Sequence, residues 1–175
     1  MKQIFFTLLF GILLSQSSVA KTNASVDEVI RASFSEVSTI DPKQIILTKE
    51  QFSQVQSRAK AAVRTKVYRY YDIKSKTQRL GYAVLIARKV RGKKATVLYA
   101  FDNSGRLKFT EIMAFGEPPE YIPNTTWMGQ LQNRDASAAL TVGKDIPTIS
   151  GSTLSARTIT EGARVARAIY EIVLK

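Results

Sequence analysis

The chain has 175 residues, a hydrophobic content of 45% and a formal net charge of +12 at pH 7. It contains no histidine and no cysteine, which excludes histidine-dependent catalytic triads, disulfides, and ordinary haem, iron–sulfur and zinc sites. The length and apolar content fit one folded domain, and the remaining chemistry is that of carboxylates, lysine, tyrosine or an organic cofactor.

The first twenty residues have the pattern of a secretory signal. Lys2 precedes an apolar span from Ile4 to Leu14, and Ser18-Val19-Ala20 is a small-x-small cleavage site. The span is shorter than the roughly 20 residues that cross a bilayer. We therefore expect cleavage near Ala20 and export to a periplasm; an uncleaved anchor is the alternative. Removing a segment with one lysine and no acid leaves a net charge of +11, which suits either an acidic partner or a merely soluble basic surface.

Two helices are expected before the first strand. Residues 25–37 place apolar side chains at helical spacing, and a second helix is predicted over residues 49–62. Thr48 and Gln51 form a capping box at the start of the second helix. We interpret residues 21–64 as an N-terminal helical segment and residues 65–175 as the main domain.

Four β-rich runs follow, over residues 67–73, 80–90, 95–101 and 107–115. Short turns ("KSKTQ", "RGKK" and "DNSG") separate these runs. Such short connections favour antiparallel neighbours, because parallel pairing needs a long crossover. The predicted fold class is α+β, with an antiparallel sheet of about four strands flanked by helices and a long C-terminal helix.

The stretch "AFGEPPEYIPNTTWMGQLQN" interrupts the strand pattern with three prolines. Asn124 or Thr125 is expected to cap a short helix that carries Trp127. Stiff loops often shape binding surfaces. The alternative is a connector whose Trp127 fills the core, and the sequence leaves both readings open.

The last segment predicts an amphipathic helix, with apolar residues at 159, 163, 166, 170 and 173. We expect a capping box from Thr158 and Glu161 and an ion pair between Arg167 and Glu171, four residues apart. A hydroxyl-rich stretch, "ISGSTLSARTIT", lies just before this helix or in its first turn.

Hydroxyl groups at a helix start have two interpretations. A helix N-terminus offers unpaired N–H groups and a positive dipole end, and it therefore suits phosphate. Ser150, Ser152, Thr153 and Ser155 add donors, and Gly151 lets the backbone approach an anion. The other interpretation is helix capping alone.

The stretch "ISGSTLSARTITEGARVARAIYEI" resembles the C-terminal end of the FMN-binding domain family. This family includes the flavin-carrying subunits of sodium-pumping NADH:quinone reductase and Rnf-type complexes, and small exported flavoproteins. Its signature is roughly Asp, two residues, Ser or Thr, Gly, Ala, Thr, followed by a helix. Ser150, Gly151 and Thr153 match it in register, whereas Ser152 stands where Ala is usual and Pro147 where Asp is expected.

The resemblance extends over roughly residues 65–175 and implies a site. "RLGYAVLIARKVRGKKATVLYAFDNSGRLKFTEIMAFGEPPEY" is similar to the family's hairpins and flavin-facing loop. In the family, the threonine that matches Thr153 receives FMN through a phosphoester bond, made by a separate Mg-dependent transferase that uses FAD. The cofactor-binding residues implied here are Ser150, Gly151, Ser152, Thr153, Leu154, Glu117 and Tyr121, with no catalytic residue and no metal ligand.

The expected function is that of a periplasmic FMN-binding flavoprotein, an electron carrier or a subunit of a redox system rather than a stand-alone enzyme. Its expected partners are the flavin transferase and unidentified redox proteins, which include membrane-associated ones, and no nucleic acid. The alternative is a non-redox basic periplasmic module that binds an anionic ligand or surface.

Overall fold

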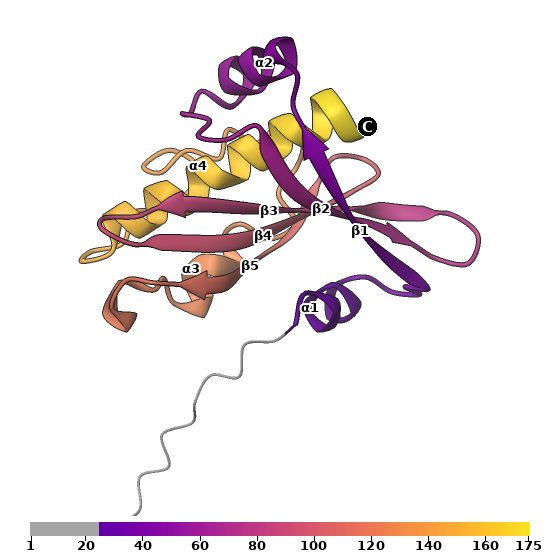
Figure 1. Cartoon of the computed structure of the whole chain (residues 1–175). Coiled ribbons are helices and arrows are strands. Elements are labelled where there is room, and N and C mark those ends of the chain that lie inside the picture. The colour runs from indigo at the N-terminus through magenta and orange to yellow at the C-terminus, as the bar shows by residue number, and fades with distance from the viewer. Residues whose placement is uncertain (1–24) are drawn as a thin grey trace, which may run out of the picture.

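The computed structural model describes residues 25–175, and the predicted signal segment lies outside this range. The strands form one antiparallel sheet in the order β1-β2-β3-β4-β5 (Figure 1). The strands are β1 (Thr39–Ile46), β2 (Val67–Lys74), β3 (Arg79–Lys89), β4 (Lys94–Asp102) and β5 (Leu107–Phe115). The helices are α1 (Val26–Ser33), α2 (Lys49–Ala59), the 3-10 turn η1 (Pro119–Tyr121), α3 (Thr125–Gly129), α4 (Thr153–Ile169) and the π-helical turn η2 (Tyr170–Leu174).

The α+β fold class and the antiparallel pairing are confirmed, but the sheet has five strands rather than four. The missed strand is β1, which lies in the segment expected to be helical and pairs with β2 alone. The sequence of β1 lacks the usual strand pattern. Only Ile45 is buried, Asp41 and Lys43 are charged, and Pro42 has no backbone N–H. An edge strand tolerates these residues, since one side of its backbone has no partner strand.

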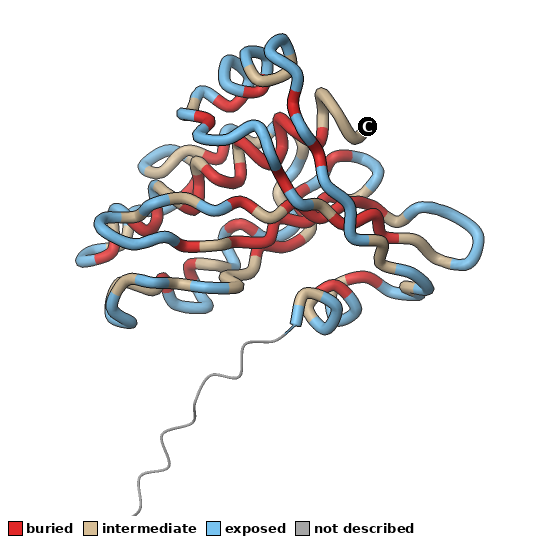
Figure 2. The backbone as a smooth tube through the Cα atoms, in the orientation of Figure 1, coloured by how far each residue is buried: buried red, intermediate tan, exposed pale blue. Residues whose placement is uncertain are grey.

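Helices cover both faces of the sheet unequally. Helices α2 and α4 pack on one face and α1 on the other (Figures 1 and 2). The alternation of β4 explains the division: Val97, Tyr99 and Phe101 belong to the core beneath α2 and α4, while Leu98 and Ala100 face α1.

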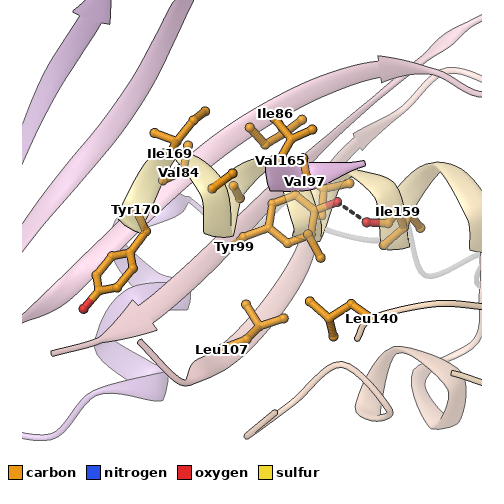
Figure 3. Packing of buried hydrophobic residues seen from close by; sticks show 14 of the residues in the cluster. Val84, Ile86, Val97, Tyr99, Leu107, Leu140, Ile159, Val165, Ile169 and Tyr170 are labelled. Atoms are coloured by element: carbon orange, nitrogen blue, oxygen red, sulfur yellow. Dashed lines mark hydrogen bonds between the residues drawn. The ribbon is translucent and has the colours of Figure 1, made fainter. Parts of the chain in front are cut away.

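Tyr99 fixes the position of α4 on the sheet. This side chain is only 1% exposed, and its hydroxyl donates a hydrogen bond to the Ile159 carbonyl at 2.7 Å (Figure 3). Burial raises the pKa of Tyr99 well above its ordinary value. The phenol therefore stays protonated and remains a donor. Gly162, one turn further along α4, lies directly against the same ring.

The starts of the helices only partly match the sequence predictions. The capping box of Thr48 and Gln51 is confirmed, and Asn124 caps α3 by accepting from the Trp127 N–H. The box expected from Thr158 and Glu161 is wrong, because α4 begins at Thr153.

The expected ion pair between Arg167 and Glu171 is also wrong. Glu171 instead pairs with Arg58 of α2, with two contacts of 2.7 and 3.1 Å. Arg167 donates to the carbonyls of Asp135 and Ala138, which holds the loop before α4 against the helix.

Candidate functional site

The hydroxyl-rich stretch turns sharply into the first turn of α4. Gly151 has a φ of +78°, a left-handed conformation that favours glycine. A Cβ at this position would meet nothing within 4 Å, so the backbone angle alone explains this glycine. Ser152 is the N-cap residue, but its side chain does not cap the helix.

The first N–H groups of α4 are therefore available to a ligand. Within residues 25–175, the amides of Thr153, Leu154 and Ser155 donate to no acceptor, and the first bonded amide is that of Ala156, to the Ser152 carbonyl. These unpaired donors lie at the positive end of a 17-residue helix. An anion placed there gains both hydrogen bonds and a favourable dipole.

A small hollow of about 180 Å³ opens at this helix start. Its lining brings together residues from three places in the sequence: Arg91, Tyr121 and the run from Gly151 to Ser155. Five of the seven predicted site residues lie here, namely Gly151, Ser152, Thr153, Leu154 and Tyr121. Ser150 is exposed and does not line the hollow, and Glu117 lies outside it as well.

Both central hydroxyls donate to backbone carbonyls. The Thr153 hydroxyl donates to the Ile149 carbonyl at 3.0 Å, and the Ser152 hydroxyl donates to the Glu120 carbonyl at 3.3 Å. The second bond ties η1 to the start of α4, which keeps Tyr121 beside Thr153. Esterification of Thr153 would remove the hydrogen that Ile149 accepts but would keep the oxygen in place.

Arg91 is the residue of the hollow that the sequence did not reveal. Its guanidinium lies 4.6 Å from the centre of the Tyr121 ring, a cation–π contact. Arg91 belongs to the turn between β3 and β4, far from Thr153 in the sequence. Neither periodicity nor a local motif marks this arginine, because only the folding of the hairpin brings it to the helix start.

Glu117 holds the turn that carries Arg91. One carboxylate oxygen accepts the backbone N–H groups of Arg91, Gly92 and Lys93 at 2.7 to 2.9 Å. The Lys93 hydrogen bond is the largest cause that lowers the pKa of Glu117, which therefore stays ionised at neutral pH. The predicted flavin neighbour Glu117 thus contacts the site through Arg91.

Trp127 occupies the core, which favours the connector reading for this residue. Its ring is 5% exposed, and its indole N–H donates to the Pro147 carbonyl at 2.8 Å. Pro147, the departure from the family pattern, thus anchors the irregular segment that enters α4. Asp145 accepts the amides of Leu140 and Thr141 and stabilises the loop instead of facing Thr153.

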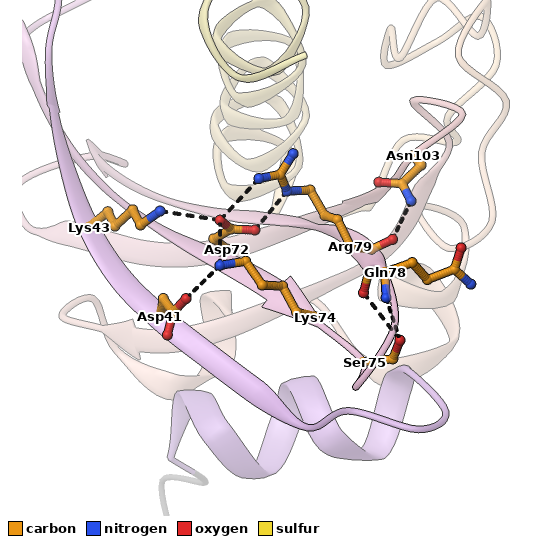
Figure 4. Close-up of polar contacts among 8 residues, drawn as sticks. All are labelled: Asp41, Lys43, Asp72, Lys74, Ser75, Gln78, Arg79 and Asn103. Atoms are coloured by element: carbon orange, nitrogen blue, oxygen red, sulfur yellow. Dashed lines mark hydrogen bonds and ion pairs between the residues drawn. The ribbon is translucent and has the colours of Figure 1, made fainter.

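A second polar cluster surrounds Asp72 on β2 (Figure 4). This carboxylate is 2% exposed and pairs with Lys43, Lys74 and Arg79 at 2.8 to 3.3 Å. Burial alone would raise the pKa of Asp72, but the hydrogen bonds from Arg79 and the two lysines outweigh it and lower that pKa. A carboxylate held ionised in this way is a poor proton donor, and its contacts join β1, β2 and β3.

Two kinds of site have no counterpart in the described part of the chain. No cluster of three or more acidic side chains is arranged to hold a metal ion among residues 25–175. In the same range, no helix has the length and apolar character needed to span a bilayer.

No protein-family model and no curated protein sequence matches the chain. The likeness to the FMN-binding domain family therefore depends on the residues that carry it, above all Ser150, Gly151 and Thr153. It stays a prediction that the geometry of the helix start can support and that experiment must test.

Proposed function

We propose that this protein is a periplasmic FMN-binding flavoprotein that carries electrons, with the FMN phosphate esterified to Thr153. The observation that carries the proposal is the position of Thr153. It is the first residue of α4, whose first three amides, its own included, have no acceptor among residues 25–175, and it lines one hollow with Arg91. These groups offset the charge of a phosphodiester, so the surroundings of Thr153 suit the product of the attachment.

The attachment needs no base from this chain. The Thr153 oxygen bonds to the FMN phosphorus of FAD, the pyrophosphate P–O bond breaks, and AMP leaves while the transferase takes the threonine proton. The transferase and its Mg²⁺ supply the activation. This division of labour explains a hydroxyl-rich site in a protein without histidine or cysteine.

The size of the hollow supports a carrier role. Its volume of about 180 Å³ leaves room for a phosphate and its immediate neighbours, whereas pockets that enclose a whole cofactor-sized ligand have roughly 300 Å³ or more. FMN supplies the redox chemistry, and its ring would lie largely outside this hollow, open to a redox partner. Tyr121 and the exposed Leu154 are the residues best placed to contact it.

Thr153→Val tests the bond, because valine keeps the shape of the side chain and removes the ester oxygen. We expect wild-type protein, made in cells that contain the transferase, to give a fluorescent band on a denaturing gel. Thr153→Val should give a dark band of equal protein amount. Thr148→Val, an exposed threonine of the preceding segment, is the matched control and should stay fluorescent. A fluorescent Thr153→Val band would place the bond on another residue.

The second candidate function is a non-redox basic module that holds an anion at the start of α4. It is favoured by one observation: the Thr153 hydroxyl already donates to the Ile149 carbonyl, so the amides and Arg91 could bind phosphate without a covalent bond. A dark wild-type band from transferase-containing cells would decide for this alternative over the covalent model.

A further inference from the structure

A second cavity, of about 460 Å³, lies at the opposite end of α4. It is enclosed by the end of α2, the loop of residues 136–144 and the last turns of α4. Its first α4 residue, Arg164, is eleven positions beyond Thr153, which is about 16 Å along a helix. The two cavities share no lining residue. We name this cavity the basic pocket.

The basic pocket is lined by small alanine side chains and by basic side chains. The walls include five alanines: Ala59, Ala136, Ala138, Ala139 and Ala168. These small side chains leave room for a ligand between the helices and the loop. The charged lining consists of Arg58, Lys60, Lys144, Arg164, Arg167 and Glu171. Five cations therefore face a single carboxylate.

That carboxylate is already used. Glu171 makes a two-contact pair with Arg58. Within residues 25–175, Lys60, Lys144, Arg164 and Arg167 have no carboxylate at ion-pair distance. Two neighbouring carboxylates accept hydrogen bonds from backbone amides of the same loop. Asp135 accepts from the Ser137 N–H, and Asp145 accepts from the N–H groups of Leu140 and Thr141. Among the described residues, the positive charge of the pocket is thus only partly compensated by nearby carboxylates.

Arg167 is the strongest sign of this imbalance. It is 6% exposed, and its Nε is buried without a hydrogen-bond partner among residues 25–175, although the other two nitrogens donate to loop carbonyls. Burial is also the largest cause that lowers the pKa of Arg167. Arg164 uses Nε and Nη1 on the carbonyls of Ala59 and Leu140, which leaves Nη2 free of any bond to the described protein. Buried charges are ordinarily paired, since an unpaired one is costly.

From this arrangement we propose that the basic pocket binds a small organic anion that carries carboxylate or phosphate groups. The volume matches a ligand of that size. Arg164 supplies a planar donor, and Lys60 and Lys144 supply mobile cations at the rim, a combination that suits multiply charged oxyanions. The inference does not depend on the flavin, because no residue of the basic pocket belongs to the Thr153 site.

Calorimetric titration of the exported protein with citrate and with inorganic phosphate tests the proposal. Wild-type protein should bind at least one of these probes saturably at a site that does not depend on Arg91. The double variant Lys60→Ala/Lys144→Ala should weaken that binding about tenfold, as expected for the loss of two partly exposed charge contacts. Neither lysine side chain makes an ion pair within the described protein, so the fold should be unchanged.

Two controls separate this site from general charge and from the helix start. Lys66→Ala/Lys76→Ala removes the same charge from exposed positions outside the pocket and should leave the affinity unchanged. Arg91→Ala removes the cation of the Thr153 site and should also leave it unchanged. The proposal would be overturned if both lysine double variants lost the same affinity for the probe, or if only Arg91→Ala lost affinity. It would also be overturned if neither probe showed saturable binding at concentrations up to about 10 mM, where the affinity is too weak to be useful.

Discussion

Gly162→Ala should destabilise the protein, although the same change in an open helix is stabilising. A Cβ at position 162 would overlap the Tyr99 hydroxyl oxygen and lie 3.0 Å from the ring carbon that bears it. Tyr99 cannot retreat, because it is fully buried and its hydroxyl is bonded to the Ile159 carbonyl. Alanine gains about 1 kcal/mol in helix propensity. Overpacking costs about 1–3 kcal/mol, and a lost buried hydrogen bond costs about 1–3 kcal/mol more.

The net expectation is a loss of about 1–5 kcal/mol in the free energy of unfolding, which corresponds to a fall in Tm of roughly 2–20 °C for a domain of this size. Urea unfolding followed by circular dichroism measures the first quantity and a thermal scan the second. Gly129→Ala is the matched control, because a Cβ there meets nothing within 4 Å; its stability should be unchanged or slightly raised.

A double-mutant cycle identifies the cause. Tyr99→Phe removes the oxygen that the new Cβ would overlap, so Gly162→Ala should cost less in that background than in the wild type. Equal costs in the two backgrounds would show that the clash is not the reason. A Gly162→Ala variant at least as stable as the wild type would refute the packing argument itself.

Two further variants test the polar contacts. Asp72→Asn leaves the partly exposed Lys43, Lys74 and Arg79 without their carboxylate and should cost about 1.5–3 kcal/mol at neutral pH. Because the folded-state pKa of Asp72 is lowered, its contribution is fully present above the ordinary value of about 3.9 and is lost as pH falls through the folded value. The difference in stability between the two proteins, measured by urea unfolding, should therefore be smaller at pH 3 than at pH 7. Trp127→Phe removes the donor to the Pro147 carbonyl and should cost about 1–3 kcal/mol by the same measurement, and an unchanged midpoint would count against that contact.

The sequence predicted the elements whose signal is local. The four strands β2 to β5 alternate and are separated by turn residues, so their bounds agree with the prediction to within one residue at each end. The long C-terminal helix was found from its apolar spacing, but its start was not. Ser152 and Thr153 lie at that start without a capping bond, so the usual capping signal is absent and a false one appeared at Thr158 and Glu161.

The missed features depend on contacts between distant segments. Strand β1 is an edge strand with one buried residue, Ile45, and only its pairing with β2 identifies it. Arg91 lines the same hollow as Thr153, and Glu117 holds the β3–β4 turn that carries this arginine. The basic pocket likewise joins α2, a loop and α4. The lysines and arginines of the basic pocket lie far apart in the sequence, so the sequence alone does not show that they line one cavity.

The same helix connects these separate findings. The first turn of α4 carries Thr153 with its unpaired amides, and its last turns carry Arg164 and Arg167. Between them, Gly162 and the Ile159 carbonyl fix the helix against Tyr99. A helix that slid or tilted on the sheet would move both ends together, since an α-helix transmits displacement as a stiff rod. Packing at Tyr99 therefore affects the geometry of both sites. Arg91 lines only the Thr153 site, and Lys144 lines only the basic pocket. Changes at Gly162 should perturb the proposed flavin attachment and the proposed anion binding in parallel, and changes at the two ends should perturb them independently.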